Sequence, residues 1–278
     1  MEIGLGSVAA IQQQVSAALA QPVATAQNFA VRESIHYVDE TGWPEGEKLR
    51  WLWIHATPEV TVFTIRPGRT KEAAQEILGQ NFTGLVNTDR YNAYHWVDES
   101  RRRLFWAHLK REFQAIKERG GKSAEIGDSL LTEVGRLFER WYELRENRID
   151  WPAFQAAMKS IEQRVGDLLR AGEQCGQEKT KRTCGNILKL ERSLWTFVRV
   201  EGIEPTNNNA ERPLRRAVLW RRKSFGTQSE SGSRFVERIL TVVTTLRQQG
   251  RDVLDYLTTV CGSVNGKSGS IRLLPNSS

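Results

Sequence analysis

Cysteine is scarce in this sequence of 278 residues, which contains only Cys175, Cys184 and Cys261. Their number is odd, and no two of them form a C-x-x-C pair. A disulfide framework and a structural zinc site are therefore not expected, and a reducing cytoplasm is the expected compartment.

Long apolar runs and targeting signals are also missing. No stretch approaches the roughly 20 apolar residues that a membrane-spanning helix needs. The N-terminus has no basic region followed by an apolar core, so no signal peptide is visible. We therefore expect no membrane partner. Aromatic residues are absent before Phe29, and the stretch "VAAIQQQVSAALA" in this region predicts a short helix.

Acidic and basic residues are unevenly distributed along the chain. Residues 1–100 contain 7 Lys and Arg against 12 Asp and Glu, whereas residues 101–278 contain 33 against 21. The net charge of +7 therefore combines −5 in the first part with +12 in the second. A basic excess confined to one part favours nucleic acid as a partner, because neutralised phosphates release counterions. A solubilising surface charge is the alternative.

Short runs of β-branched and aromatic residues begin at Ser34 and predict a sheet. "SIHYVDET", "KLRWLWIHAT" and "VTVFTIRP" are separated by turn-forming "GWPEGE" and "PE", and together they predict an antiparallel meander. "TKEAAQEILGQ" predicts a helix capped by Thr70, "TGLVNTD" a fourth strand and "RRLFWAHL" a fifth. Strand–strand–strand–helix–strand–helix–strand is the order of an α/β fold with an RNase H-like mixed sheet.

The rest of the chain is predicted to be helical. Residues 110–200 contain two long stretches whose apolar residues share one stripe, with Leu137 and Trp141 in the first and Phe154 and Met158 in the second. We interpret these stripes as core faces. The expected division is a helical lead-in segment 1–33, the first part of an RNase H-like core 34–112, a helical insertion 113–200, the second part of the core 201–261 and a flexible tail 262–278.

Two aspartates occupy positions where strands display reactive groups. In "IHYVDET", alternation puts Ile35, Tyr37 and Asp39 on one face and His36, Val38 and Glu40 on the other. Asp39 thus belongs to an apolar face, where a lone carboxylate costs free energy unless something binds it.

Asp89 emerges at the end of the apolar run "GLVNTD". Either aspartate alone fits a turn cap. Two acids at the ends of neighbouring strands repel each other unless a cation lies between them, and oxygen-only ligands favour magnesium or manganese.

Glu211 is a third candidate acid, at the head of a run of six cations: Arg212, Arg215, Arg216, Arg221, Arg222 and Lys223. Capping-box spacing from Asn208 and an i+4 ion pair with Arg215 would make Glu211 an ordinary helix cap. Pro213 favours a helix that starts at Arg212, with the proline as its first residue. Glu211 would then lie just outside the helix, available to a metal. Spacing alone leaves both interpretations open.

Five motifs resemble one known family. "VDETGW", "RWLWIHAT", "NTDRYNAY", "FWAHLKREF" and "TNNNAERPLRRAVLWRRKSFG" are similar, in order and spacing, to motifs of the insertion sequence 66 family of DDE transposases. The resemblance covers about Gly4 to Leu257. It implies an RNase H-like catalytic domain with a helical insertion between the second and third acids. By motif, Asp39, Asp89 and Glu211 match the three catalytic acids, which would bind two Mg²⁺ ions, with Mn²⁺ as a substitute.

The resemblance implies an enzyme that cuts DNA at transposon ends with metal-activated water and joins the freed 3′-hydroxyl to target DNA. The cations after Glu211 would contact backbone phosphates: Arg212, Arg215, Arg216, Arg221, Arg222 and Lys223. His108 matches a histidine of the family motif, and a place beside the metals and a core position on the fifth strand are both open. Trp43, Trp51 and Trp53 are expected to pack rather than to stack on bases.

The implied partners are double-stranded DNA, further copies of this chain in a homo-oligomer, and accessory proteins encoded by the same element, in a bacterial cytoplasm at the nucleoid. Two alternatives stay open: an RNase H-like nuclease without strand transfer, and a non-catalytic remnant that binds DNA. Family members carry a helix-turn-helix and a cysteine-rich zinc module ahead of the catalytic domain. Residues 1–33 contain neither, so we expect a catalytic portion, a truncated copy or a misassigned start, inactive alone if truncated.

Overall fold

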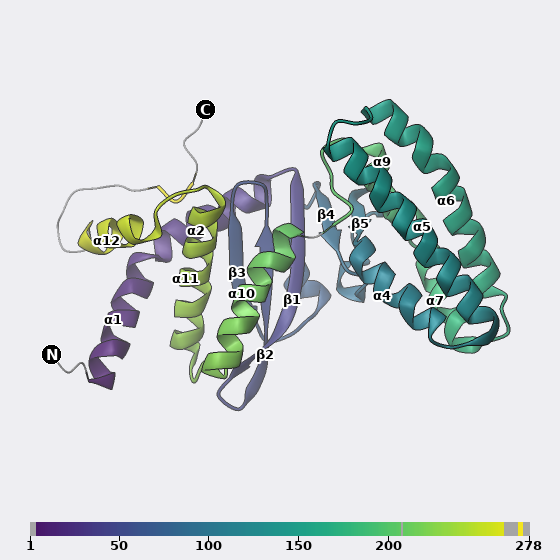
Figure 1. Ribbon diagram of the computed structural model, residues 1–278. Coiled ribbons are helices and arrows are strands. Elements are labelled where there is room, and N and C mark those ends of the chain that lie inside the picture. The colour runs from purple at the N-terminus through teal and green to yellow at the C-terminus, as the bar shows by residue number, and fades with distance from the viewer. Residues whose placement is uncertain (1–3, 207, 264–271, 275–278) are drawn as a thin grey trace. The chain divides into compact units, whose positions relative to one another are not determined.

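The computed structural model describes residues 4–206, 208–263 and 272–274 (Figure 1). The chain divides into two compact units. One, here called the sheet unit, comprises residues 1–86, 91–96 and 208–278, and the other, the helical unit, comprises residues 87–90 and 97–207. Of the expected flexible tail, residues 264–271 and 275–278 lie outside the described residues. Among the helices that are described, none has the length and apolar character needed to cross a membrane.

The predicted antiparallel meander is confirmed. It consists of β1 (Ile35–Glu45), β2 (Lys48–Ala56) and β3 (Thr61–Arg66). Asp39 pairs with Ile54 across the first two strands, and Ile54 pairs with Phe63 across the next two. β1 continues through "GWPE", so the turn narrows to Gly46 and Glu47, and Gly46 adopts the left-handed backbone conformation (φ 56°) that glycine tolerates best.

The predicted helix after the meander and the fourth strand are confirmed as α3 (Lys71–Leu78) and β4 (Leu85–Thr88). Thr70 caps α3 by accepting a hydrogen bond from the Ala73 N–H. The Leu85 N–H donates to the Ser34 carbonyl oxygen (2.8 Å), so β4 starts beside the start of β1. The strand order is β3-β2-β1-β4-β5. The predicted α/β class with a mixed sheet is thereby confirmed.

The predicted fifth strand is too long. β5 spans only Arg102–Leu104, and α4 (Trp106–Lys117) follows after a single residue. The buried side chains Trp106, Leu109, Phe113 and Ile116 recur at spacings of three and four, which is the period of a helix. "FWAHL" therefore starts a helix although its composition suits a strand.

Two helices cover one face of the meander, as Figure 1 shows: α10 (Asn208–Ser224) and α11 (Glu230–Gln248). Their buried residues form one core with Tyr37, Ile54 and Phe63 of the strands; on the helices these are Ala210, Leu214, Ala217, Val236 and Leu240. Tyr37 and Asp39 are two positions apart on β1, so they point to the same face. The predicted alternation along β1 is confirmed, and Asp39 lies on the face that α10 covers.

The other helices of the sheet unit build a second core. The predicted N-terminal helix is present as α1 (Leu5–Ala18), and α2 (Ala20–Arg32) follows it. Side chains of α2, such as Val23 and Ala26, pack with Val62 of β3, with α11 and with α12 (Val253–Ser263). Trp43 and Trp53 are fully buried, which confirms their predicted packing role, and Trp51 is half-buried.

The helical unit is built from long amphipathic helices, as the apolar stripes predict. α5 (Gly121–Arg145) packs against α4 and α6 (Trp151–Glu173), and α6 packs against α7 (Glu178–Leu188). Leu137 and Trp141 are buried on α5, and Phe154 and Met158 on α6. η1 (Asn92–Tyr94) belongs to the sheet unit, whereas η2 (Glu99–Arg101), α8 (Glu191–Leu194) and α9 (Thr196–Arg199) are short helices of the helical unit.

Candidate metal and nucleic-acid site

Asp39 is held on the covered face of β1 by the strand itself. The side chain is partly buried, and its Oδ1 accepts a hydrogen bond from the Glu40 backbone N–H (2.8 Å). Around it the face is apolar, with Tyr37 beside it on β1 and Ile54 opposite it on β2. The carboxylate of Asp39 is thus set in a largely apolar face, where burying a charge is costly unless it is compensated.

Glu211 lies inside α10, and the predicted start of this helix at Arg212 is wrong. The helix begins at Asn208 and carries Pro213 in its interior. Proline there removes the backbone bond to Asn209 and crowds its carbonyl. The longer helix is favoured because Ala210, fully buried, lies on the same apolar stripe as Leu214.

The position of Glu211 along β1 can be inferred from contacts at the C-terminal end of α10. Arg221 Nη1 donates to the Thr41 hydroxyl (3.0 Å) and the Gly42 carbonyl oxygen. Farther along both segments, the Thr227 N–H donates to the Pro44 carbonyl oxygen (3.0 Å), so α10 and β1 run in the same direction.

Ten helical residues rise about 15 Å, which matches four to five strand residues. Counting back from Thr41 and Arg221 therefore brings Glu211 level with His36 and Tyr37, two to three residues before Asp39 on the same strand. Glu211 and Asp39, 172 positions apart in the sequence, are thus carried by a helix and a strand that pack against each other.

One oxygen of Glu211 is chemically unsatisfied. Oε1 is buried and has no hydrogen-bond partner among the residues described. The ion pair with Arg215 expected for a simple cap is likewise absent from the described part of the chain. Burying a carboxylate oxygen without a partner is costly, so such atoms mark places where an ion or ligand binds.

The donors of the sheet unit fit a hard divalent cation. Asp39 and Glu211 offer carboxylate oxygens, which are the ligands that Mg²⁺ and Mn²⁺ prefer. Across residues 4–206, 208–263 and 272–274, no three His, Cys, Asp or Glu side chains form a group ready to hold a metal ion. The pair in the sheet unit therefore needs a further ligand.

The cations of α10 separate into two flanks. At about 100° per residue, Arg215 and Arg222 lie within about 40° of Glu211 around the helix axis. Arg212 and Arg216 lie about 100° and 140° away from it. Arg221 differs from both sets because its contacts with Thr41 and Gly42 hold α10 to β1. We assign it to that role rather than to DNA.

Asp89 directly follows β4 in the helical unit, at the strand end that the sequence predicts. Arg102, almost fully buried, holds this corner: its Nη2 donates to the Asp89 carbonyl oxygen (2.8 Å) and its Nε to the Thr88 hydroxyl (3.2 Å). Arg90 forms an ion pair with Glu112. The backbone at Asp89 is therefore fixed by a buried guanidinium.

His108 lies in the first turn of α4, so its predicted place on a fifth strand is wrong. The ring is partly buried and meets Phe105 edge to face, with centroids 5.8 Å apart. His108 is helical because α4 starts early, and the helical spacing of its buried residues outweighs the strand-like composition.

Glu40 is a second acid of the "DETGW" motif, and the sequence pattern alone does not reveal its role. Its side chain is fully buried on the opposite face of β1, where it pairs with Arg69 and accepts a hydrogen bond from the Tyr94 hydroxyl (2.6 Å). The Arg69 guanidinium lies 3.7 Å from the centre of the Tyr91 ring, and the Tyr91 hydroxyl donates to the Arg69 carbonyl oxygen. Side chains of the "DETGW" and "NTDRYNAY" motifs are thus in contact through this cluster. The presence of both motifs in the sequence was the only sign from which this contact could have been predicted.

Two buried histidines share the face of Glu40. His36 Nδ1 and His55 Nε2 are 2.8 Å apart and their rings stack. Burial lowers the pKa of His36 to about 4, and burial together with the nearby His36 lowers the pKa of His55 to about 3. Both rings are therefore neutral at pH 7, with one nitrogen donating and the other accepting.

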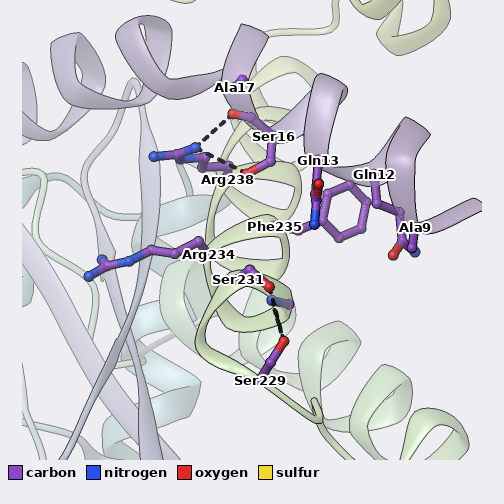
Figure 2. Close-up of a pocket in the computed structure, with 11 residues that line it drawn as sticks. Ala9, Gln12, Gln13, Ser16, Ala17, Ser229, Ser231, Arg234, Phe235 and Arg238 are labelled. Carbon is purple, nitrogen blue, oxygen red and sulfur yellow. Dashed lines mark hydrogen bonds between the residues drawn. The ribbon is translucent and has the colours of Figure 1, made fainter. Parts of the chain in front are cut away.

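A cavity of about 380 Å³ in the sheet unit lies elsewhere, between α1 and α11 (Figure 2). Arg238 of α11 donates to the backbone carbonyl (2.9 Å) and the hydroxyl (3.1 Å) of Ser16, and Phe235 lines the same space. No carboxylate lines this cavity, so it offers no ligand set for metal chemistry.

With the acids and cations placed, comparison with known proteins identifies the family. The family model described as "Transposase IS66 family" matches residues 1–234. The chain belongs to this family. The resemblance read from the motifs is confirmed. The match includes Asp39, Asp89 and all of α10 but ends within the first turns of α11.

A curated relative adds little about chemistry. The uncharacterized protein y4qI of Sinorhizobium fredii is 25% identical over 257 residues, which cover 80% of this chain and 46% of the relative. The chain thus spans about half the length of that relative. No solved structure matches this chain.

Proposed function

We propose that this IS66-family chain forms the catalytic portion of a DDE transposase with an RNase H-like core. It cleaves DNA at transposon ends and transfers the freed 3′-hydroxyl to target DNA. Asp39, Asp89 and Glu211 are its metal ligands, for two Mg²⁺ ions or for Mn²⁺ as a substitute. The buried Glu211 Oε1 without a described partner, on the helix that packs against the strand of Asp39, is the observation that carries the proposal.

The chain contributes geometry and charge to this reaction. Metal ions, when bound, lower the pKa of the attacking water or hydroxyl and neutralise the departing oxygen. Asp39 is oriented by the Glu40 N–H. Glu211 is carried in the first turn of α10, where the positive end of the helix dipole stabilises a negative charge. Asp89 supplies the third carboxylate from the end of β4.

The flank of α10 that carries Glu211 also carries the cations best placed to act with it. Arg215 and Arg222 are exposed and have no ion-pair partner among the described residues. In this proposal they contact backbone phosphates near the scissile bond, together with Lys223 at the end of the helix. Such contacts neutralise charge and steady the strand without reading its sequence. The active complex is a homo-oligomer on double-stranded DNA, joined by accessory proteins of the same element.

Conservative changes of the three acids test the ligand assignment. Asp39→Asn, Asp89→Asn and Glu211→Gln should each abolish Mg²⁺-dependent cleavage of a labelled duplex, because an amide is a poor ligand for a hard cation. Each should keep the melting temperature and the salt-sensitive binding of DNA. Glu47→Gln, an exposed acid in the β1–β2 turn, is the matched control and should cleave normally. A Glu211→Gln protein that cleaves normally but melts earlier would make Glu211 a helix cap.

A substrate with a pre-cut 3′ end separates transposition from plain hydrolysis. The proposal requires joining of that end to a second duplex, observed as a branched product on a denaturing gel. A protein that hydrolyses DNA in an Asp39-dependent manner and never joins it would be a nuclease built on the same acids.

A further inference from the structure

The flank of α10 that faces away from Glu211 borders a cavity of about 230 Å³ in the sheet unit. Asn209, Arg212 and Arg216 line it from α10, and Arg247 lines it from the last turn of α11. Its volume is below the roughly 300–1,000 Å³ typical of sites for drug-sized molecules. A cavity of this size suits one small group with its immediate neighbours.

The charge of this cavity is uncompensated. Arg212, Arg216 and Arg247 approach it from two helices, and none of the three has an ion-pair or side-chain hydrogen-bond partner in the part of the chain that the structure describes. No carboxylate is among the residues that line it. Like charges that converge repel each other, so the arrangement is stabilised by an anion between them.

Hydrogen bonds hold one of the side chains that line the cavity. Gln248 lines it, and its amide nitrogen donates to the carbonyl oxygens of Thr57 and Pro58, both at 2.7 Å. Its amide oxygen accepts from the Thr61 hydroxyl (2.8 Å). These bonds anchor the end of α11 to the β2–β3 turn, and so they set the position of Arg247. Arg247 is therefore carried into the lining of this cavity by an anchored helix end, across from Arg212 and Arg216 of α10.

We propose that this cavity binds a phosphate of the DNA backbone, held by Arg212, Arg216 and Arg247. The planar fork of arginine matches phosphate oxygens in pairs, and the Asn209 amide adds a neutral donor. Because the cavity lies on the other flank of α10 from Glu211, this phosphate is not the scissile one. The site fixes the duplex at a second point and leaves the reacting group to the Glu211 flank. It rests on the proposed function, in which DNA is the substrate.

Arg247 provides the test because it lies outside the motif that carries Glu211 and is exposed on its helix. Arg32 is the matched control, an exposed arginine in the last turn of α2 without a described ion-pair partner. Binding of a fluorescent duplex is measured by anisotropy at several salt concentrations in EDTA, so no cleavage is needed. Arg247→Ala should weaken binding three-fold or more and lower the slope of log affinity against log salt by about 0.9, the effect of one lost phosphate contact.

Arg247→Lys should restore most of the slope, and Arg32→Ala should match the wild type. An Arg247→Ala protein that binds DNA like the Arg32→Ala protein overturns the proposal. Inorganic phosphate, compared with chloride at equal ionic strength, should raise the melting temperature of the wild type and not of Arg247→Ala. If it raises both equally, the cavity is not the site.

Loss of the phosphate effect with unchanged DNA affinity would mean that the cavity takes a free phosphate, and the DNA-backbone assignment would then be wrong. Failure of the proposed chemistry would appear in a different experiment, the cleavage assay, as cleavage that persists in Asp39→Asn.

Discussion

Adjacent acids on β1 have opposite surroundings because successive strand residues point to opposite faces. Asp39 points toward α10 and has the Glu40 N–H as its backbone donor. Glu40 points to the other face, where Arg69 and the Tyr94 hydroxyl compensate its charge fully inside the protein. The two carboxylates therefore have different neighbours. The difference arises from a single step along the strand.

The Glu40 cluster should therefore contribute more to stability than to chemistry. Glu40→Gln removes the charge with which Arg69 pairs, and breaking one side of a buried ion pair costs about 3 kcal/mol. Tyr94→Phe removes one hydrogen bond to the same carboxylate and should cost about 1 kcal/mol. Urea unfolding measures both. A Glu40→Gln protein as stable as Tyr94→Phe would show that the ion pair contributes little.

The buried pair His36 and His55 predicts how stability depends on pH. Both pKa values are lowered, to about 4 and about 3, whereas an unfolded histidine titrates near 6.5. The unfolded state then binds more protons below pH 6.5, so the stabilisation is complete above that pH and is lost as pH falls toward 4. Each pKa unit corresponds to about 1.4 kcal/mol per group.

Urea unfolding between pH 8 and 5 should therefore show a free energy of unfolding that falls below pH 6.5. His55→Gln keeps a polar side chain that cannot titrate, so it should flatten this fall even if it lowers stability at pH 8. If the free energy of unfolding of His55→Gln fell equally steeply with pH, groups other than this histidine pair would be responsible.

At the scale of the element, α10 delivers both the candidate ligand Glu211 and the cations. Its extension back to Asn208 keeps Ala210 in the core at the expense of a proline in the helix interior. Pro213→Ala should therefore raise the free energy of unfolding by about 1–3 kcal/mol, because it restores a backbone bond and removes a clash. The rise should be visible as a higher melting temperature.

The opposite result would support the helix start that the sequence predicts. If α10 began at Arg212, Pro213 would occupy its preferred first position, and alanine there would lower stability by increasing the freedom of the unfolded chain. The sign of the change thus decides where the helix begins in solution.

At the scale of the whole molecule, charge separates along the chain into −5 over residues 1–100 and +12 over the rest. Arg215→Ala and Lys223→Ala should each weaken binding to unrelated duplexes by the same factor and reduce its salt dependence, because phosphate contacts carry no sequence information. Anisotropy with several duplex sequences measures this. A loss confined to one sequence would mean that these side chains contact bases.

Prediction from the sequence succeeded where a pattern is local. The meander, the Thr70 cap and the alternation of Asp39 and Glu40 follow from composition and spacing within a few residues. It failed where a distant surface decides the outcome. Trp106 adopts a helical conformation, and Ala210 belongs to α10, because each side chain fills a core made by other segments. Neither core can be inferred from the local composition. The Glu40–Tyr94 bond was missed for the same reason.

The sequence by itself determined the family, the α/β class, the strand that carries Asp39 and the run of cations after Glu211, because these follow from motifs and from short periodic patterns. Only the tertiary structure decided that the helix of Glu211 packs on the strand of Asp39, which cations of α10 share a flank with Glu211, and that Arg247 joins Arg212 and Arg216 around one cavity. These are contacts between residues far apart in the chain, and they exist only once the helices have packed on the sheet.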